Sequence, residues 1–338
     1  MYDLKKSIKN IITYNHLPPR YKEGDIINIG YGIDNNYARC AGTSIVSFCV
    51  NNPEQNFRFH ILASDLSSVS KEKFKLLAEN YRFDVNIYEI DSSFFDKLPT
   101  RTSFPVPTYY RFVLPLILKN LDKIFYVDAD IICLNNTSEL FNKEFDDNIL
   151  MAVPDTKQTN DERNKDLGLL NHIYFNAGVL GINVRKWNEF NIFDTLITEL
   201  LKDPKKFYML DQDALNLILT GKVKYLPRKF NWFNGFYKWE KDSIENKDII
   251  LLHFTSSPKP WDLGWSINTM CNKYNINLYN NYEKLTPWAN LSPVMPKLSQ
   301  YKKLRLYSRD LKHHGYYWKS FEWYIKYLLT KIKYLMNK

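Results

Sequence analysis

The chain has 338 residues, 45% of them hydrophobic and 16% aromatic, and a formal net charge of +9. This composition can build one large hydrophobic core or two smaller ones, and it excludes a low-complexity disordered protein. No stretch approaches the roughly 20 apolar residues of a membrane-spanning helix. Residues 1–14 lack the apolar core and cleavage site of a signal peptide. The four cysteines have neither metal-site spacing nor disulfide-framework density, so we expect free thiols and a cytoplasmic protein.

Short apolar runs alternate with longer amphipathic runs through the first half of the chain. We expect strands at residues 26–29, 57–62, 85–90 and 124–127, and helices at residues 37–50, 71–81 and 108–118. This alternation predicts an α/β domain with a largely parallel sheet. Ligands of such sheets bind beyond the carboxyl ends of the strands, which directs attention to residues 32–37 and 128–130.

The second half continues with a strand that ends at Asp155, a polar loop at residues 156–166 and an apolar stretch at residues 174–184. Helices are expected at residues 187–201 and 211–219, and a buried strand at residues 249–254. No internal repeat is present. We therefore expect an N-terminal extension at residues 1–24, one domain at residues 25–265 and a basic, aromatic region at residues 266–338.

Asp128 and Asp130 follow the hydrophobic strand at residues 124–127. In an extended chain both carboxylates would point to the same side, where they repel each other unless a cation lies between them. Oxygen ligands favour Mg²⁺ or Mn²⁺ over zinc. Alone, the pair has a simpler interpretation, in which one Asp caps a turn and the other is solvated.

Two further segments strengthen the metal interpretation. Residues 30–37 form a polar, glycine-containing strand end that could meet a nucleotide, although a plain turn with Asn35 or Asn36 as helix cap would look the same. His253 follows the buried run at residues 249–252, and Lys259 comes soon after. A histidine and a lysine after a strand suggest a metal ligand and a phosphate partner, whereas a lone histidine is usually only hydrogen-bonded.

Six ordered motifs together resemble glycosyltransferase family 8, whose members are retaining enzymes that use nucleotide sugars. The motifs are residues 33–37 (IDNNY), 108–112 (TYYRF), 126–130 (YVDAD), 174–179 (YFNAGV), 210–213 (LDQD), and His253 with residues 259–261 (KPW). The resemblance implies a GT-A fold, a mixed or parallel Rossmann-like sheet flanked by helices. The basic aromatic tail resembles that of bacterial members that extend the lipopolysaccharide core.

The resemblance also implies roles for individual residues. Asp128, Asp130 and His253 would hold Mn²⁺ or Mg²⁺, which bridges the two phosphates of a UDP-glucose or UDP-galactose donor. The uridine pocket would consist of Gly32, Ile33, Asp34, Asn36 and Tyr37. The donor sugar and diphosphate would meet Arg111, Ala129, Asp155, Asn176, Ala177, Asp211, Ser256 and Lys259, with Gln212 beside the anomeric carbon. Ser256 departs from the glycine that is common at this position.

A mechanism follows from these roles. An amide is a poor nucleophile, so Gln212 favours departure and attack on the same face of the sugar over a covalent intermediate. Asp155 or Asp211 would then stabilise the oxocarbenium-like transition state electrostatically.

The excess positive charge lies in the tail. Residues 301–338 contain ten Lys and Arg against two acidic residues, or +8 of the +9. Between residues 316 and 337 a helix would carry one apolar stripe with Lys319, Lys326 and Lys333 on its flank. The stripe consists of Trp318, Phe321, Ile325, Leu328, Ile332 and Leu335. This pattern is typical of a helix in a membrane interface, here the anionic inner membrane, although packing on the domain or a short coiled coil would also use such a stripe.

Three competing functions remain at this stage. A transferase of the same fold could act on a protein or soluble polysaccharide. A degenerate descendant could bind sugar without catalysis, although the motifs are intact. A nucleic-acid-binding module would suit the net charge, but the charge is confined to the tail and no nucleic-acid-binding motif accompanies it, so we expect no nucleic acid as partner.

Overall fold

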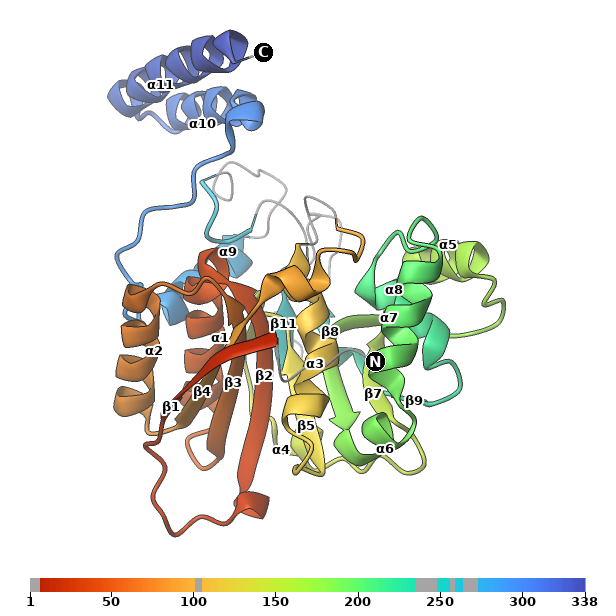
Figure 1. Cartoon of the computed structure of the whole chain (residues 1–338). Helices are drawn as coiled ribbons and strands as arrows, with labels where there is room; N and C mark the ends of the chain where they lie inside the picture. Colours follow the sequence, from red (N-terminus) through yellow and green to blue (C-terminus); the bar gives the residue numbers. More distant parts are fainter. Residues whose placement is uncertain (1–6, 101–104, 235–247, 256–258, 264–272, 338) are drawn as a thin grey trace. The chain divides into compact units, whose positions relative to one another are not determined.

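The computed structural model describes residues 7–100, 105–234, 248–255, 259–263 and 273–337 (Figure 1). The chain divides into two compact units. The first comprises Met1–Trp232, Asp248–His253 and Leu285–Trp288, and the second comprises Phe233–Lys247, Phe254–Lys284 and Ala289–Lys338. Among the described residues, Cys40, Cys49 and Cys133 form no disulfide bond, and Cys271 lies outside the described residues.

The first unit is built on an eight-stranded sheet with the order β1-β4-β3-β2-β5-β8-β7-β9. The strands are β1 (Ile8–Tyr14), β2 (Ile26–Asp34), β3 (Asn56–Ser64), β4 (Asp84–Ile90), β5 (Lys123–Val127), β7 (Leu150–Pro154), β8 (Phe175–Asn183) and β9 (Val223–Tyr225). Strand β2 pairs in parallel with both β3 and β5, and β8 is antiparallel to β5 and β7. The sheet is therefore mixed, with a parallel centre at β4-β3-β2-β5.

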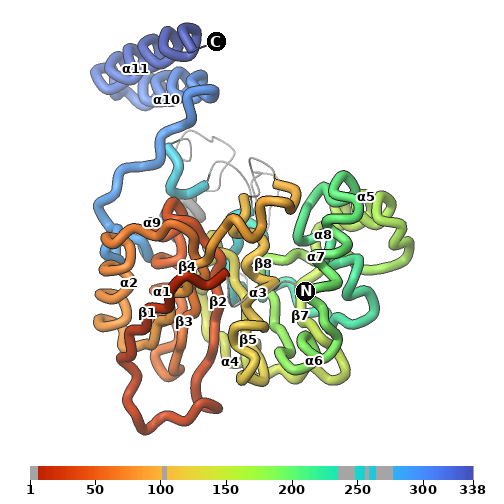
Figure 2. The backbone as a smooth tube through the Cα atoms, in the orientation of Figure 1, coloured from red at the N-terminus to blue at the C-terminus, as the bar shows by residue number. Residues whose placement is uncertain are grey.

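Helices cover both faces of this sheet, as the side chains of β2 demonstrate. The hydroxyl of Tyr31 bonds to Ser44 of α1 (Ala38–Asn51) at 3.0 Å. The neighbouring positions Gly30 and Gly32 face Leu114 and Tyr110 of α3 (Tyr110–Ile117). Because successive residues of a strand point to opposite faces, α1 and α3 lie on opposite sides of the sheet. Figure 2 traces the chain from β2 through α1 to β3, and through α2 (Ser68–Tyr81) to β4.

The remaining helices of the first unit differ from the sequence-based expectation in two places. They are α4 (Ser138–Phe141), α5 (Lys157–Leu167), α6 (Val184–Glu189), α7 (Ile192–Lys202) and α8 (Asp211–Ile218). The prediction of a loop at residues 156–166 is wrong, because α5 occupies most of these residues. Thr156 caps the start of α5, where its side chain accepts a hydrogen bond from the Thr159 N–H. The single helix expected at residues 187–201 is two helices, since Asn191 has a left-handed φ of 51°.

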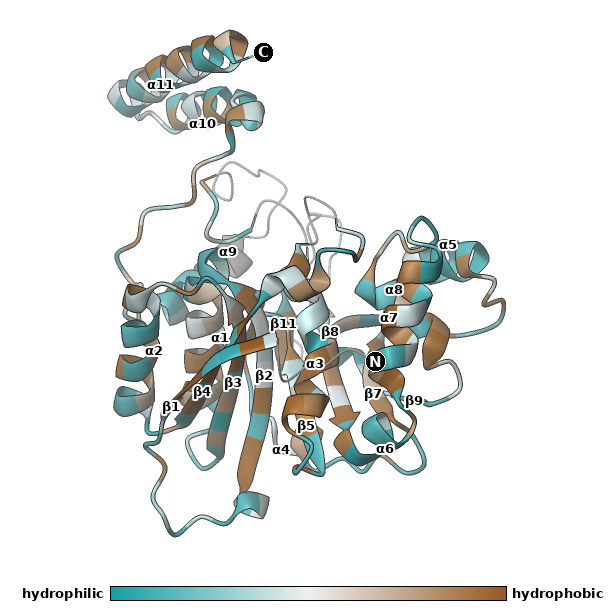
Figure 3. Cartoon of the chain, in the orientation of Figure 1, coloured by the Kyte–Doolittle hydropathy of each residue, from teal (hydrophilic) through white to brown (hydrophobic). Residues whose placement is uncertain are grey.

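Two further differences concern strands. Residues 8–14, expected in an extension ahead of the domain, form β1 and pair antiparallel with β4. The buried strand expected at residues 249–254 is the shorter β11 (Leu251–His253), which pairs antiparallel with β6 (Ile131–Cys133). The two-residue strand β10 (Trp232–Phe233) falls at the boundary between the units along the chain. Figure 3 shows hydrophobic residues concentrated in the central strands and hydrophilic residues along α2 and α5.

The second unit contains α9 (Lys273–Glu283), α10 (Lys302–His313) and α11 (Tyr317–Met336). Helices α10 and α11 pack together: Ser308 and Ser320 exchange hydroxyl-to-carbonyl hydrogen bonds at 2.8 and 2.7 Å, and Tyr327 packs near Leu304. Helix α11 matches the helix expected at residues 316–337. None of the helices in the described part of the chain has the length and hydrophobicity needed to cross a membrane.

Candidate active site

The site lies where β2 and β5 end. These neighbouring strands are parallel, so their carboxyl ends reach the same edge of the sheet, with Asp34 at the end of β2 and Asp128 directly after β5. Residues 32–37 and 128–130, which we expected to bind ligands, therefore lie at the same edge of the sheet.

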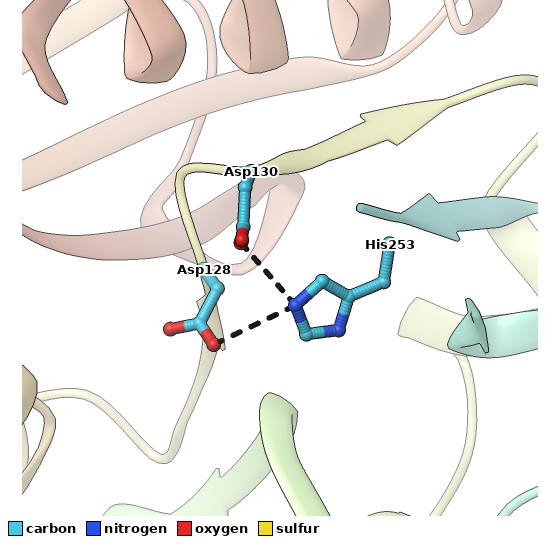
Figure 4. Close-up of side chains that lie close together, drawn as sticks. All are labelled: Asp128, Asp130 and His253. Carbon is cyan, nitrogen blue, oxygen red and sulfur yellow. Dashed lines mark ion pairs between the residues drawn. The ribbon is translucent and has the colours of Figure 1, made fainter. Parts of the chain in front are cut away.

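Asp128, Asp130 and His253 converge, as Figure 4 shows. The Nε2 atom of His253 is 3.2 Å from Oδ1 of Asp130 and 4.0 Å from Oδ2 of Asp128. The two aspartates do not lie on an extended strand as the sequence suggested. The Ile131 N–H donates to the Asp128 carbonyl at 3.1 Å, which closes a turn that turns both carboxylates toward β11.

The donor atoms of these three side chains fit a divalent cation. Each residue offers one ligand atom, and these atoms lie within 4.8 Å of one another. The Nδ1 atom of His253 is 2.9 Å from the Asn231 side-chain oxygen, so Nδ1 carries the proton and Nε2 presents a lone pair. Two carboxylates and a lone pair that face one another repel, and a cation between them removes this repulsion. Carboxylate oxygens suit Mg²⁺ and Mn²⁺, and an imidazole ligand is typical of transition metals.

Arg111 connects the acid pair with the rest of the site. Its Nη2 donates to Oδ1 of Asp128 at 2.9 Å, and its Nε lies 3.0 Å from Oδ2 of Asp211. Its guanidinium lies 4.5 Å from the ring centre of Tyr126, whose hydroxyl donates to the same Asp128 oxygen. These contacts occupy Oδ1 of Asp128, which directs Oδ2 toward His253.

The charges of this cluster are strongly influenced by burial. Burial alone would lower the pKa of Arg111, but Asp128 and Asp211 outweigh it and raise that pKa above its ordinary value. Burial raises the pKa of Asp211 to about 6, against the lowering effects of Arg111 and of the Thr108 hydroxyl. Asp211 is 3% exposed and its oxygens are held by Thr108 and Arg111. Asp211 therefore holds Arg111 in place.

Gln212, Asn176 and Asp155 form a second cluster. The Gln212 side-chain oxygen accepts from the Ala177 N–H at 3.0 Å and from the Asn176 amide at 3.2 Å. The Gln212 amide donates to Oδ2 of Asp155 at 3.1 Å, and the Asn176 amide donates to the same oxygen at 3.2 Å. Unlike Asp211, Asp155 is partly exposed, so its carboxylate remains accessible to a ligand.

Local backbone features place these side chains. The β7–β8 register shifts between Ala152, opposite Leu180, and Val153, opposite Asn176. This bulge inserts extra residues in β8, and bulges of this kind re-aim side chains beside active sites. Leu210 adopts a φ of 46° immediately before α8, an uncommon conformation for a large residue that places Asp211 and Gln212 in the first turn.

The expected uridine pocket has a defined local structure. Oδ1 of Asp34 accepts from the N–H groups of Asn36 and Tyr37 at 2.9 and 3.1 Å and caps the short helix η3 (Asn35–Tyr37). Gly32 is tightly packed, since a Cβ there would lie 2.7 Å from the Pro107 carbonyl oxygen. The missing side chain of Gly32 thus lets the chain before α3 pack on β2. Contact of these residues with a base remains a prediction.

Neither of the two residues expected to contact the diphosphate belongs to the first unit. Lys259 belongs to the second unit, where its backbone N–H donates to Asp262 and its ammonium group to the Phe254 carbonyl. Ser256 lies outside the described residues. Their contact with a diphosphate also remains a prediction.

Sequence reasoning missed several residues that hold the site together. Asn231 contacts His253, Tyr126 contacts Asp128, and the Tyr174 hydroxyl contacts Gln212 and Asp213. Tyr126 and Tyr174 lay inside the quoted motifs without a role, and nothing in the local sequence distinguishes Asn231 from other asparagines.

Comparison with known proteins adds independent information. The model of glycosyl transferase family 8 matches residues 28–263. A lipopolysaccharide 1,3-galactosyltransferase of Salmonella typhimurium is 29% identical over 342 residues, which cover 98% of each chain. A lipopolysaccharide 1,2-glucosyltransferase of Escherichia coli is 32% identical, over 98% of this chain and 96% of the relative.

Solved structures agree on the fold. The galactosyltransferase LgtC, crystallised with donor and acceptor sugar analogues, superimposes with a TM-score of 0.67 at 22% identity. The match covers 82% of this chain and all of that chain. The expected GT-A-like arrangement of a mixed sheet flanked by helices is thereby confirmed.

Proposed function

The chain belongs to glycosyltransferase family 8, and on this premise we propose that it transfers glucose or galactose from a UDP-sugar to the core of lipopolysaccharide or lipooligosaccharide. Relatives that align over nearly the whole chain carry lipopolysaccharide glucosyltransferase and galactosyltransferase names, which supports both the reaction class and the acceptor. The structural observation that carries the proposal is the convergence of Asp128, Asp130 and His253 beside Arg111 and the Gln212 cluster.

The proposed donor site runs along the edge of the sheet. Asp128, Asp130 and His253 hold the divalent ion, Mn²⁺ or Mg²⁺, and the segment from Gly32 to Tyr37 takes the uridine. Arg111, Asn176 and the Ala129 and Ala177 backbone take the sugar, and Lys259 with Ser256 takes the diphosphate. The bound ion would supply positive charge to the departing diphosphate.

The chain's own groups support a retaining reaction that forms an α linkage. Both polar atoms of the Gln212 amide are held by protein partners, so it presents a fixed dipole and no nucleophile. Asp155 is better placed than Asp211 to stabilise positive charge on the sugar, because Asp211 is buried against Arg111. We therefore propose departure and attack on the same face of the ring. Covalent sugar trapped on Asp155 or Asp211 would contradict this route.

The first experiment identifies the donor. Purified protein is incubated with UDP-glucose, UDP-galactose and other UDP-sugars, with Mn²⁺ or with EDTA, and UDP release is measured. We expect one hexose donor to be hydrolysed only with the metal, and Asp130→Asn to reduce the rate by orders of magnitude, on the order of 100-fold or more, with the fold intact. Asp161→Asn, on the exposed face of α5, is the matched control. Full activity in EDTA would remove the metal from the proposal.

A second experiment identifies the acceptor. Truncated lipopolysaccharide core, soluble oligosaccharides and protein acceptors are compared with the donor found above, and the anomeric configuration of the product is read by NMR. We expect transfer to the truncated core with an α linkage. Preferential transfer to a protein or soluble polysaccharide would favour the alternative acceptor class, and a β product would exclude retention.

We further propose that α11 attaches the enzyme to the anionic cytoplasmic surface of the inner membrane. Its expected apolar stripe is largely exposed: Trp318 is 86% exposed, Phe321 59% and Ile332 54%. The other side of α11, with Ser320 and Tyr327, packs on α10, so the two helices bury one stripe and present the other. Leu328 departs from the expected stripe, because it packs partly against this small core. Basic residues on both helices complement an anionic surface.

Liposome flotation tests the membrane proposal. Vesicles with anionic lipid should bind the wild type, while the double substitution Trp318→Ser and Phe321→Ser or deletion of residues 316–338 should abolish binding. Leu170→Ser removes an equally exposed apolar side chain from the first unit and should leave binding unchanged. Unchanged binding after the deletion would contradict the proposal.

A further inference from the structure

A chain of buried hydrogen bonds leads from His253 to the Gln212 cluster. The His253 Nδ1–H donates to the side-chain oxygen of Asn231 at 2.9 Å, and the Asn231 amide donates to the side-chain oxygen of Asn176 at 2.8 Å. The Asn176 amide then donates to Gln212 and to Asp155. Asn231 is fully buried, so each of these polar atoms depends on its protein partner.

Backbone N–H groups fix the orientation of the side-chain amides in this series of hydrogen bonds. The Gly178 N–H donates to the Asn176 side-chain oxygen at 2.9 Å, and the Ala177 N–H donates to the Gln212 side-chain oxygen at 3.0 Å. An N–H group can only donate, so both side-chain oxygens are acceptors. The Asn231 amide must therefore point its nitrogen toward Asn176 and its oxygen toward His253.

The packing of the His253 ring is an independent observation. A Cβ on Gly178 would lie 2.4 Å from Cε1 and 2.8 Å from Nδ1 of His253. The imidazole thus packs against the bare backbone of β8, next to the bulge that places Asn176. The contact with Gly178 on one face of the ring and the hydrogen bond at Nδ1 allow one ring orientation, with the proton on Nδ1 and Nε2 directed toward Asp128 and Asp130.

We propose that Asn231 is a positioning residue that holds the imidazole of His253 ready to bind the metal and connects it, through Asn176, to Gln212 and Asp155. The inference rests on the proposed function, since it assigns Asn231 to the same metal and donor site. A group that accepts a hydrogen bond from the second ring nitrogen of a metal-binding histidine fixes the tautomer and the direction of the lone pair on the first. Here that group also belongs to the amide cluster beside the sugar, so the metal and sugar halves of the site share one scaffold.

Two substitutions of Asn231 distinguish its hydrogen bond to His253 from its hydrogen bond to Asn176. Asn231→Leu removes both hydrogen bonds at similar volume. We expect Mn²⁺ affinity, measured by electron paramagnetic resonance of free Mn²⁺, to fall roughly 10–100-fold. Asn231→Asp still accepts from His253 but cannot donate to Asn176, so we expect Mn²⁺ affinity to be retained and kcat for donor hydrolysis to fall.

A spectroscopic measurement is independent of turnover. In metal-free protein, ¹⁵N NMR of the histidine rings should show a hydrogen-bonded proton on Nδ1 of His253, with the resonance assigned by its loss in His253→Gln. In Asn231→Leu this hydrogen-bonded Nδ1–H signal should be lost, and Gly178→Ala should shift the same resonance because the ring must move. Asn52→Leu is the matched control, a buried asparagine whose partners in the described structure are Thr137, Phe48 and Cys133.

The outcomes distinguish the inference from the proposed function. Wild-type Mn²⁺ affinity together with an unchanged Nδ1–H signal in Asn231→Leu would overturn the role of Asn231 and leave the proposed function standing. A wild-type protein that binds no Mn²⁺ would overturn the metal site itself and the inference with it. An equal loss of affinity in Asn52→Leu would show a general effect of destabilisation and would also overturn the role of Asn231.

Discussion

His60 is a buried histidine at the centre of the sheet, away from the proposed chemistry. Its Nε2 lies 2.9 Å from the Asn28 side-chain oxygen and its Nδ1 lies 3.2 Å from the Tyr88 hydroxyl. Burial, with a smaller contribution from nearby Arg58, lowers the pKa of His60 to about 3. The imidazole is therefore neutral in the folded protein above about pH 3, and it acts as a hydrogen-bonding bridge between β2, β3 and β4.

This shift predicts a loss of stability in mild acid. Above a pH of about 6.5, His60 is neutral in both states and contributes no pH dependence. Below it, the unfolded chain takes up a proton that the folded protein refuses until about pH 3, so the free energy of unfolding falls by up to about 1.4 kcal/mol per pH unit. Urea unfolding between pH 7 and 5 should show a shallower decline for His60→Gln than for the wild type. His172→Gln, at an exposed histidine, should follow the wild type, and parallel curves for all three would contradict the assignment.

At this scale the sequence predicted the residues that carry charge and missed those that orient them. Asp128, Asp130 and His253 were predicted because they stand in ordered motifs that resemble a known family, although each feature alone has a simpler structural explanation. The structure brings the three side chains together. Asn231 was not predicted, because its role depends on contacts with His253 and Asn176, which are 22 and 55 residues away in the chain. A buried amide has no local sequence signal.

Helices α5 and α8 are joined by a buried ion pair. Arg163 of α5 donates to both oxygens of Asp213 in α8 at 3.1 and 2.7 Å, and Asp213 is fully buried. Asp213 also accepts from the Tyr174 hydroxyl and the Met209 N–H. Since Tyr174 in turn accepts from Gln212 at 3.3 Å, this pair holds the first turn of α8 against β8.

A double-mutant cycle tests this pair. Arg163→Met leaves the Asp213 charge buried without its cation and should reduce the free energy of unfolding by about 3–5 kcal/mol. The double variant with Asp213→Asn should lose much less free energy of unfolding than the sum of the losses of the two single variants, because the partners are coupled. Unfolding in guanidinium chloride measures all three variants. Lys157→Met removes an exposed ion pair with Asp161 in the same helix and should leave the free energy of unfolding almost unchanged. Additive losses at Arg163 and Asp213 would contradict the coupling.

Helix α5 also explains which elements could be predicted from sequence. The strands of the parallel centre and helices α1, α2 and α8 have apolar patterns that match their burial, and they were predicted within a few residues. Helix α5 has a largely polar sequence and is anchored by Arg163 and Asn164, so hydrophobic periodicity cannot reveal it. Its signals were the Thr156 cap and Gly168, which ends it with a left-handed φ of 73°. Strand β1 was missed because an edge strand with exposed faces has little apolar pattern.

For the whole molecule, charge and chemistry are divided between the two units. The proposed metal ligands lie in the first unit, and most of the net positive charge lies in the α10–α11 region of the second. The basic residues that we propose to meet a membrane thus belong to a different unit from the proposed metal ligands. Catalysis on a soluble acceptor should thus tolerate changes in the tail that abolish lipid binding.

Ligand-induced stabilisation tests the donor site on the intact chain. A ligand that binds only the folded state at 100 times its dissociation constant adds about 2.7 kcal/mol to the free energy of unfolding. For domains of this size class each kcal/mol raises Tm by about 2–4 °C, so Mn²⁺ with UDP should raise the Tm of the wild type by several degrees. Asp128→Asn should lose most of this shift, because Oδ2 of Asp128 is one of the three converging ligand atoms. ADP with Mn²⁺ should give a smaller shift than UDP if residues 32–37 recognise uracil, and equal shifts for the two nucleotides would exclude that pocket.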